Sequence, residues 1–442
     1  MRKNIVLFSF DDCIAFWRYS TLFGVKLQTP NLDRLRAVST TFSAAYCQSP
    51  LCGPSRASFM SGRAPHDTWI LDNKTKAFTV LKPEDIWSYQ LKANGYFCSS
   101  GGKVHHGYVP LPDEIHAALY SDHKKFFPRD LRLRPEVKRR ALGGTGGGYG
   151  TLDPEDDQGY YDAQSARSFI EFLDGYSGDA PFYREVGFFS PHTPFITPLR
   201  FKQLYRAADI AYPEEWNEEL KEDGAHFDGV RVNFRTYDKP YWQKSVRNYF
   251  SAVSHGDYQL GLVWDALQAS KYAENTIMVL LTDHGLHLGE KRRFGKSTLL
   301  EQIANVPFII HDPASPKAQT IDDPVALIDV GPTLMDMVGL PAPANSLGLS
   351  LMPLLEGKLE GTNQLRDRAV PTLQIDGATI RKGRYRFTRT QAGTAAVYDL
   401  ENDWWQRRPH GMEHPAFAEL SEAHHAACAA YSANFDDVRF QR

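Results

Sequence analysis

The chain has 442 residues, of which 42% are hydrophobic and 23% charged, a balance typical of a globular protein with one large domain and a smaller one. Its 50 lysines and arginines nearly balance 53 acidic residues, so the net charge of −3 gives no reason to expect nucleic acid or a membrane as a partner. The five cysteines are sparse and odd in number, which argues against a disulfide-built secreted protein.

The first apolar segment, residues 5–10, follows a short polar start. This run is too short for the core of a signal peptide, and no later stretch is long and apolar enough to span a membrane. We therefore expect a cytoplasmic protein whose first strand begins close to Met1.

Short apolar runs bounded by turn residues predict buried strands along the chain. The expected strands are 5–10, 96–98, 182–189, 277–281 and 308–310. Helices are expected between them, one capped by Thr29 with Pro30 at its first position, and another over 161–173. Alternating strands and helices predict an α/β fold, in which a large, mostly parallel sheet carries helices on both faces.

The segment Cys52-Gly-Pro-Ser-Arg56 carries the strongest functional signal. Proline is tolerated in the first turn of a helix, so Cys52 is expected at or just before a helix N-terminus, where backbone N–H groups favour an anion. Arg56 adds a fixed charge with forked donors suited to tetrahedral oxyanions. The alternatives are an inert buried cysteine, or a disulfide or zinc site shared with Cys47, although the sequence has no second close cysteine pair to complete a zinc site.

Polar, chemically versatile residues follow four of the expected strands. They are Asp11 and Asp12 after the first strand, Lys103, His105 and His106 after the second, His192 after the third, and Asp283 and His284 after the fourth. Any one of these groups alone would be an ordinary turn or helix cap. Because ligands bind beyond the carboxyl ends of parallel strands, we expect all four groups to converge with Cys52.

The converging side chains divide into two chemical halves. The three aspartates and His284 supply hard oxygen ligands and one nitrogen, which suit a divalent metal ion. Lys103, Lys296 and the other histidines supply positive charge and protons. A metal and cations that face a nucleophile suit displacement at a tetrahedral oxyanion, because the charge must be neutralised and the leaving oxygen protonated.

Two further segments predict architecture. The glycine-rich run 143–150 lacks nucleotide-binding spacing and is expected to be a flexible loop that could cover the site. Near residue 357 the pattern changes to short β-like pieces with a turn at Lys382-Gly383. We therefore expect a catalytic domain over 1–357 and a small C-terminal α+β subdomain with an antiparallel sheet over 358–442.

The Cys52-Gly-Pro-Ser-Arg56 segment resembles the C-x-P-S-R signature of the type I sulfatase family, part of the alkaline phosphatase superfamily, in which this cysteine is oxidised to formylglycine. The other motifs resemble the family in the same chain order: an aspartate pair, Lys-x-His, a central histidine, an aspartate followed by Asn or His, and a late lysine. His284 after Asp283 most resembles the iduronate-2-sulfatase-like members. In those members the functional histidine lies one place later, so His105 and His106 both stay candidates.

The resemblance implies a fold, cofactors and partners. The fold would be alkaline-phosphatase-like, and the aspartates with His284 would bind one divalent ion, calcium first, with magnesium or manganese as alternatives. Cys52 would be converted to formylglycine by a formylglycine-generating enzyme of the host. The substrate would be a small-molecule or saccharide sulfate ester, and a homo-oligomer is compatible with the sequence.

The resemblance also implies roles for individual residues. The hydrated aldehyde derived from Cys52 would attack sulfur while Asp283 helps to deprotonate it. His192 or Lys296 would protonate the leaving alcohol, and one of the paired histidines would remove the proton needed to expel sulfate. Lys103 would join Lys296 in binding the sulfate group.

Two rival functions follow from the same residues. A phosphonate monoester or phosphodiester hydrolase of the superfamily shares the nucleophile motif and the Asp-His pair. Asp12 favours the sulfatase, because those hydrolases usually carry an amide at this place. A non-catalytic binding protein that retains the pocket is the third hypothesis, and the presence of every member of the residue set argues against it.

Overall fold

The computed structural model describes residues 2–128, 136–217, 238–358, 363–391 and 393–434. Its α-helices are α1 Phe16–Tyr19, α2 Pro30–Arg36, α3 Cys52–Ser61, α4 Pro65–Thr68, α5 Trp87–Ala93, α6 Asp113–Leu119, α7 Tyr161–Gly175, α8 Leu199–Gln203, α9 Lys239–Ala269, α10 Glu301–Ala304, α11 Val330–Met337, α12 Met352–Leu355, α13 Asn363–Arg366 and α14 Phe417–Ala430. Among these residues, none of the helices has the length and apolar character that a membrane span requires.

Within the described residues, the central sheet has seven strands in the order β13-β2-β12-β9-β1-β7-β4. Their bounds are β1 Asn4–Phe10, β2 Thr40–Phe42, β4 Phe97–Gly102, β7 Phe182–Gly187, β9 Thr276–Thr282, β12 Phe308–His311 and β13 Gln319–Ile321. β1 pairs in parallel with β7 and β9, and β4 continues in parallel beyond β7. β12 alone is antiparallel to both of its neighbours, so the mostly parallel sheet is confirmed.

Shorter strands form small ladders around this sheet. They are β3 Ala45–Tyr46 with β14 Val325–Ala326, β5 Arg139–Ala141 with β6 Tyr149–Thr151 and β8 Thr197–Pro198, and β10 His287–Leu288 with β11 Phe294–Gly295. The β10–β11 pair carries the loop that leads to Lys296.

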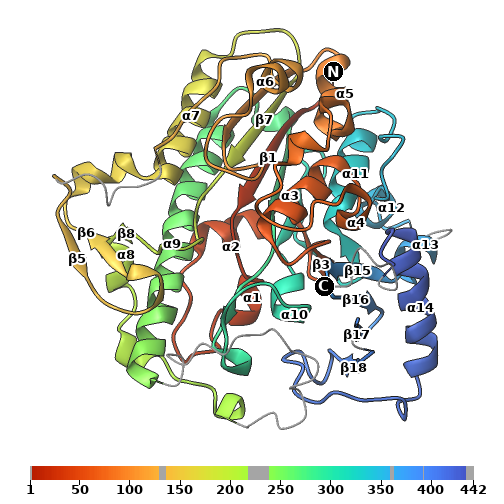
Figure 1. Cartoon of the computed structure of the whole chain (residues 1–442). Helices are drawn as coiled ribbons and strands as arrows, with labels where there is room; N and C mark the ends of the chain where they lie inside the picture. Colours follow the sequence, from red (N-terminus) through yellow and green to blue (C-terminus); the bar gives the residue numbers. More distant parts are fainter. Residues whose placement is uncertain (1, 129–135, 218–237, 359–362, 392, 435–442) are drawn as a thin grey trace.

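Helices cover both faces of the central sheet (Figure 1). Ile5 and Leu7 of β1 pack with residues of α3, α5 and α11, whereas Val6 and Phe8 pack on the other side with residues of α2, α7 and α9. Every residue of β1 is buried. A strand that is covered on both faces has no solvent-facing side, which explains its continuous apolar sequence.

The C-terminal part is a four-stranded antiparallel sheet packed against α14 (Figure 1). Its strands are β15 Val370–Gln374, β16 Gly377–Lys382, β17 Tyr385–Thr390 and β18 Ala395–Asp399. The predicted turn at Lys382-Gly383 joins β16 to β17, with Gly383 at a φ of 52°. The small antiparallel sheet is therefore confirmed, whereas the division at residue 357 stays a prediction.

The start of α2 shows a different cap from the one expected. Pro30 is the first residue of the helix and Thr29 precedes it, but the Thr29 side chain makes no capping hydrogen bond. Asp257 of α9 accepts hydrogen bonds from the backbone N–H groups of Asn31 and Leu32 instead, at 3.1 and 2.7 Å. A carboxylate from another helix thus satisfies the free donors of this helix end.

The glycine-rich segment is bound to α9. Asn248 of α9 donates a hydrogen bond to the Gly143 carbonyl at 2.8 Å, and Ser245 accepts one from the Thr145 N–H at 2.8 Å. The expected loop over 143–150 includes a short 3-10 turn, Thr145–Gly147, and the start of β6, and its flexibility stays a prediction. The composition of the run gave no indication of the polar side chains on α9 that bind its backbone.

Candidate active site

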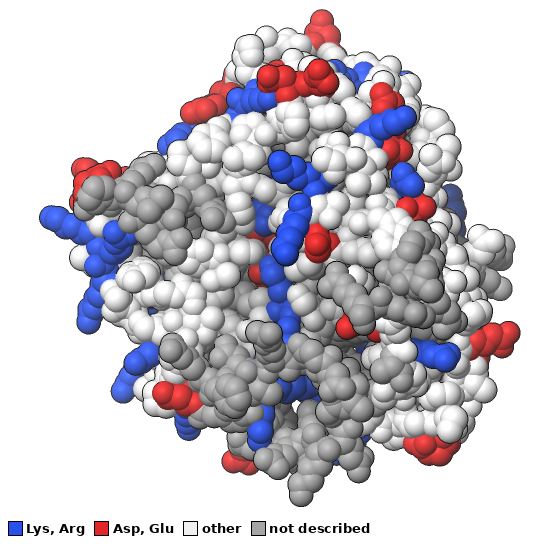
Figure 2. Space-filling view, in the orientation of Figure 1, with Lys and Arg blue, Asp and Glu red and all other residues white. Residues whose placement is uncertain are grey.

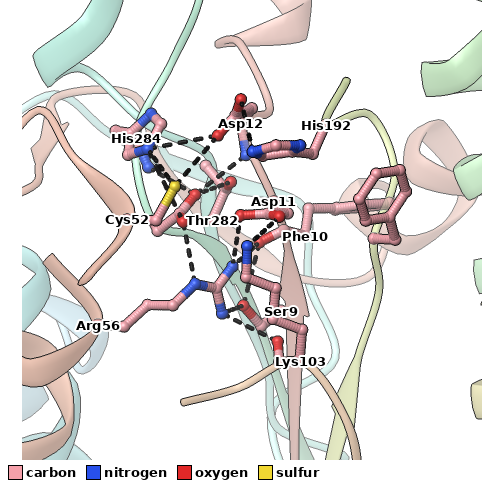
Figure 3. Close-up of polar contacts among 12 residues, drawn as sticks. Ser9, Phe10, Asp11, Asp12, Cys52, Arg56, Lys103, His192, Thr282 and His284 are labelled. Atoms are coloured by element: carbon pink, nitrogen blue, oxygen red, sulfur yellow. Dashed lines mark hydrogen bonds and ion pairs between the residues drawn. The ribbon is translucent and has the colours of Figure 1, made fainter. Parts of the chain in front are cut away.

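The predicted polar groups meet at the carboxyl end of β1 (Figure 3). Asp11 and Asp12 follow β1, Lys103 follows β4, His192 lies beyond β7, Asp283 and His284 follow β9, and Cys52 begins α3. Figure 2 shows Lys and Arg side chains in a line down the middle of the face turned to the viewer. Such a line of cations attracts anionic molecules to this face.

Cys52 is the first residue of α3, preceded by Leu51 in an extended conformation, as the sequence predicts. Its side chain is buried, with Sγ 3.2 Å from His284 Nε2, 2.9 Å from Lys296 Nζ and 3.6 Å from Asp12 Oδ1. All five cysteines are free, which rules out a disulfide between Cys52 and Cys47. The sulfur atom therefore lies among charged groups and not in an inert apolar core.

Four residues could hold a metal ion together. Asp12, Cys52, Asp283 and His284 each offer one ligand atom, and these atoms lie within 4.8 Å of one another. His284 Nδ1 lies 2.9 Å from the Gly285 carbonyl, which can only accept a hydrogen bond. Nδ1 therefore carries the proton in the neutral ring, and the Nε2 lone pair faces the group, as a metal ligand requires.

Arg56 lies behind the carboxylates, with its guanidinium group fully buried. Its Nε donates to Asp283 Oδ2 at 2.9 Å and its Nη2 to Asp11 Oδ1 at 3.1 Å. The remaining donors bind Ser9 Oγ and the carbonyl oxygens of Phe10, Lys103 and Val104. The structure thus corrects the expectation that Arg56 presents its donors to an oxyanion, because protein groups already accept from all three nitrogen atoms. Arg56 instead orients the two aspartates.

The two lysines lie beside different aspartates. Lys103 Nζ forms an ion pair with Asp11 and donates to Tyr108 Oη at 2.9 Å. Lys296 Nζ donates to the two carboxylate oxygens of Asp12 at 2.7 and 3.0 Å, in addition to its contact with Cys52. Both predicted lysines are therefore present at the site.

His192 approaches Asp12 from the loop after β7 (Figure 3). Its Nε2 lies 3.8 Å from Asp12 Oδ2, and its Nδ1 contacts the Thr193 carbonyl. Burial lowers the pKa of His192, but the carboxylates of Asp12 and Asp11 outweigh burial, so its pKa is raised overall. The ring accordingly holds a proton more readily than a free histidine does.

The paired histidines point to different surroundings. His105 Nε2 lies 3.1 Å from Tyr120 Oη, which donates to the buried Glu185 at 2.6 Å. His106 has its pKa lowered to about 4, first by burial and then by the positive charge of Lys103. Its buried Nδ1 has no hydrogen-bond partner among the residues that the structure describes. This arrangement favours His106 over His105 as the histidine at the charged centre.

Asp11 and Asp12 stay ionised although they are buried. Burial raises the pKa of Asp12, but the charges of His192 and Lys296 outweigh burial and lower it to about 2. Burial also raises the pKa of Asp11, and the charge of Lys103 reverses the shift, so the pKa lies well below its usual value. Negative charge is therefore fixed at this site, which is the condition for binding a cation.

The thiol of Cys52 is not activated. Its pKa is raised by burial and then by the carboxylates of Asp283 and Asp12. Nucleophilic cysteines in other proteins have a lowered pKa and react as thiolates. The surroundings of Cys52 therefore disfavour a reaction through the sulfur atom itself.

Some residues that hold the site gave no functional signal in the sequence. Asp12 has a φ of 62°, and Tyr249 of α9 supports this conformation, donating to the Asp12 carbonyl at 2.7 Å and accepting from Ile14 N at 3.0 Å. Asn73 Oδ1 accepts a hydrogen bond from Gly53 N at 2.7 Å, beside Cys52. Asp11-Asp12 was found because it follows a strand, whereas tyrosine and asparagine in remote segments carry no such pattern.

The sequence matches known sulfatases. A family model described as Sulfatase matches residues 3–340. A sulfatase from Formosa agariphila is 33% identical over 427 residues, which cover 91% of this chain and 82% of that protein. Human (Homo sapiens) iduronate 2-sulfatase is 26% identical over 396 residues, which cover 80% of this chain and 68% of that protein. The chain belongs to the sulfatase family and is a sulfuric ester hydrolase. Members of this family generally use formylglycine and a divalent metal ion.

Solved structures share the fold over nearly the whole chain. Phosphonate monoester hydrolase of Agrobacterium radiobacter has a TM-score of 0.78 at 20% identity, covering 97% of this chain and 95% of that one. A protein solved in complex with its substrate D-glucosamine-2-N,6-O-disulfate has a TM-score of 0.76 at 18% identity. The match covers 98% of this chain and 99% of that one. At these identities the likeness concerns the fold alone, and the predicted alkaline-phosphatase-like α/β fold is confirmed.

Proposed function

We propose that Cys52, converted to formylglycine, is the centre at which this enzyme hydrolyses sulfate esters. The observation that carries the proposal is the position of Cys52 at the N-terminus of α3, with its Sγ within 3.6 Å of Asp12, His284 and Lys296. The aldehyde supplies, in its hydrated form, an oxygen nucleophile in place of the thiol. Backbone N–H groups and the helix dipole at this end of α3 favour negative charge there.

A divalent ion fits the carboxylate side of the site. The proposed ligands are Asp11, Asp12, Asp283 and His284. Asp11 lies outside the group of four residues whose ligand atoms are close together. Among the described residues its Oδ1 accepts a hydrogen bond from Arg56 alone, which leaves a second lone pair for an ion, whereas its Oδ2 accepts from both Lys103 and Tyr108. Three carboxylates select a hard cation, calcium first, with magnesium or manganese as alternatives. The ion would supply positive charge to the nucleophile and to a sulfate oxygen.

This metal assignment has a readout that does not depend on turnover. A bound ion stabilises the folded state by about 2.7 kcal/mol at one hundred times its Kd. Calcium added to chelator-treated protein should therefore raise the Tm, and one ion per chain should be found by elemental analysis. The Asp283→Asn variant should lose this shift. A Tm unaffected by calcium, magnesium and manganese would contradict the assignment.

Protonation and charge neutralisation fall to residues of the chain. His192 can donate a proton to the leaving alcohol, because its raised pKa favours the protonated ring and its Nε2 lies near Asp12. Lys296 already donates to Asp12 at 2.7 and 3.0 Å, so we assign it to charge neutralisation with Lys103. The lowered pKa of His106 keeps its ring neutral, and its buried Nδ1 has no hydrogen-bond partner among the described residues. His106 can therefore accept a proton.

The proposed substrate is the sulfate ester of a saccharide or of a small alcohol. Two observations support it: the fold of a protein solved with a disulfated glucosamine, and a relative that is an iduronate 2-sulfatase. The line of basic side chains in Figure 2 also suits an anionic saccharide. A formylglycine-generating enzyme of the host is the partner that this function requires.

The test combines mass spectrometry with paired kinetics. The protein is purified from a host that makes the converting enzyme, and the peptide that contains Cys52 is weighed. We expect the mass of formylglycine, and a higher kcat/KM for 4-nitrophenyl sulfate than for the matching phosphate or a phenylphosphonate ester. Cys52→Ala should be inactive with a nearly unchanged Tm. A clear preference for the phosphorus esters would favour the rival function.

A further inference from the structure

The Tyr108 hydroxyl closes a hydrogen-bonded triangle at the site. Lys103 Nζ donates to Tyr108 Oη at 2.9 Å, Tyr108 Oη donates to Asp11 Oδ2 at 3.1 Å, and Lys103 forms an ion pair with the same carboxylate oxygen. Each corner therefore binds the other two. The hydroxyl accepts a hydrogen bond from the ammonium group and donates its own hydrogen to the carboxylate.

Packing fixes the ring that carries this hydroxyl. The Tyr108 ring contacts Tyr161 and Phe189, with ring centroids 5.8 and 5.5 Å apart. Lys103 Nζ also lies 4.6 Å from the centroid of the Tyr108 ring. Gly107, at a φ of 115°, turns the chain between Lys103 and Tyr108 so that both side chains return to one point. The hydroxyl is thus held in place from outside the triangle.

The triangle leaves Lys103 with one donor to spare. An ammonium group has three N–H bonds, and two of them are used by Asp11 and Tyr108. The third has no partner among the residues that the structure describes. We propose that Tyr108 is a positioning residue that directs this third N–H of Lys103 toward an oxygen of the bound sulfate group. The inference rests on the proposed function, and it concerns a residue outside the sulfatase motifs of this sequence.

The physical reason is the geometry of a tetrahedral ammonium group. With two donors fixed, the direction of the third is fixed as well. With only Asp11 as an anchor, the group can rotate about the line between the two charges, and its free N–H bonds no longer point to one place. A misdirected donor loses much of its value to a bound anion.

The test removes the hydroxyl and keeps the ring. Tyr108→Phe should lower kcat/KM for an aryl sulfate about tenfold and weaken inhibition by inorganic sulfate by a similar factor, since a hydrogen bond from a charged group is lost. The matched control is Tyr205→Phe, because the Tyr205 hydroxyl binds Gln28 N at 2.8 Å and Ser254 Oγ at 2.6 Å within the buried core. Both variants should show similar Tm changes, but the control should keep its sulfate affinity.

A double-mutant cycle separates positioning from a merely structural effect. Sulfate affinity is measured by calorimetry for wild type, Tyr108→Phe, Lys103→Met and the double variant. Because Tyr108 acts through Lys103, its substitution should cost nothing further once Lys103 is absent. The inference is overturned if Tyr108→Phe stays within twofold of wild type, or if its loss persists undiminished in Lys103→Met. If wild type cleaves no sulfate ester, the proposed function fails, while the sulfate-binding cycle still decides the role of Tyr108.

Discussion

Arg56 shows how single residues sustain a buried site with many charges. It is enclosed with Asp11 and Asp283, and its pKa is raised because these two carboxylates outweigh the effect of burial. Two carboxylates so close together would repel each other if nothing stood between them. The planar guanidinium of Arg56 donates to both from two different nitrogen atoms, whereas a lysine ammonium carries its three donors on a single atom.

Replacing Arg56 with lysine should therefore be severe. Breaking a buried ion pair costs about 3–5 kcal/mol, because the remaining charge stays buried and unpaired. We expect Arg56→Lys to lower the free energy of unfolding by this amount and to abolish turnover. Denaturant unfolding measures the first effect. Arg34→Lys is the control, since its partner Asp265 and Arg34 itself are both exposed. Equal stability of the two variants would contradict the positioning role.

Asp12 should set the preference between sulfate and phosphate esters. Its buried carboxylate reduces the net positive charge of the site, and a phosphate monoester carries more negative charge than a sulfate monoester. Asp12→Asn should therefore narrow the ratio of kcat/KM between 4-nitrophenyl sulfate and 4-nitrophenyl phosphate.

The control for this prediction is Asp265→Asn, which changes the charge of the chain equally at an exposed position. The ratio should stay at the wild-type value in that variant. If the ratio widens in Asp12→Asn, Coulomb repulsion is not what separates the two substrates.

At the residue scale, the sequence predicted the groups that do chemistry better than those that support them. Asp283 and His284 were found because they directly follow a buried strand. Tyr249 is 237 positions from Asp12, to which it donates its hydroxyl hydrogen, and no local pattern could reveal that pairing. The role of Arg56 was misjudged for the same reason, because its partners lie at the ends of β1, β4 and β9, far from α3 in the sequence.

At the scale of elements, the close approach of β4 and β7 positions Lys103. Gly102 ends β4 at a φ of 92°, and a Cβ atom there would lie 1.9 Å from the Gly187 carbonyl oxygen. The two strands pair in parallel up to this residue. Only glycine allows the backbones to approach so closely immediately before the lysine.

Gly102→Ala should therefore separate the strand ends and displace Lys103. We expect a loss of stability of about 3 kcal/mol or more from the backbone clash. Gly95→Ala is a matched control, because Gly95 has a similar φ of 85° but no atom within 4 Å of the added Cβ. The control should lose about 1–2 kcal/mol from backbone strain alone. Equal losses in the two variants, measured by denaturant unfolding, would show that the close approach is unimportant.

Elements with strong local patterns were predicted well. β1, α3 and α7 lie where apolar runs and helix-start residues indicated them. α9 was missed, although Asp238, which caps it by accepting from Tyr241 N at 3.2 Å, is a readable start signal before a proline. The antiparallel direction of β12 could not be predicted, because it depends on which strands become neighbours.

At the scale of the whole molecule, the C-terminal sheet is joined to the catalytic part by buried polar contacts. Arg386 of β17 donates to Glu301 Oε2 at 2.8 and 2.6 Å, and Glu301 also accepts from Tyr46 at 2.9 Å. Trp404 and Trp405 contact Tyr19, with ring centroids 6.1 and 5.5 Å apart. We therefore expect the two parts to unfold as a single cooperative unit.

Calorimetry should accordingly show one unfolding transition. Arg386→Met should lower its Tm as a whole, because Glu301 would be left buried without its cation, at a cost of about 3–5 kcal/mol. Arg366→Met should have little effect, since its ion pair with Asp323 is largely exposed. Two separate transitions, with only the smaller one shifted by Arg386→Met, would show that the C-terminal part unfolds independently.

The burial of Cys52 has a consequence for the order of events during synthesis. The side chain is 1% exposed on a helix whose ten residues are all buried, so the proposed converting enzyme would have to reach it before α3 packs. Arg56, one turn along α3, binds Asp283, which lies 227 positions later in the chain. At ribosomal rates of about 5–20 residues per second, the segment waits roughly 10–45 s for this partner to be made. The proposed oxidation of Cys52 would therefore have to occur within this interval, and folded protein that was not converted in time should resist later treatment with the converting enzyme.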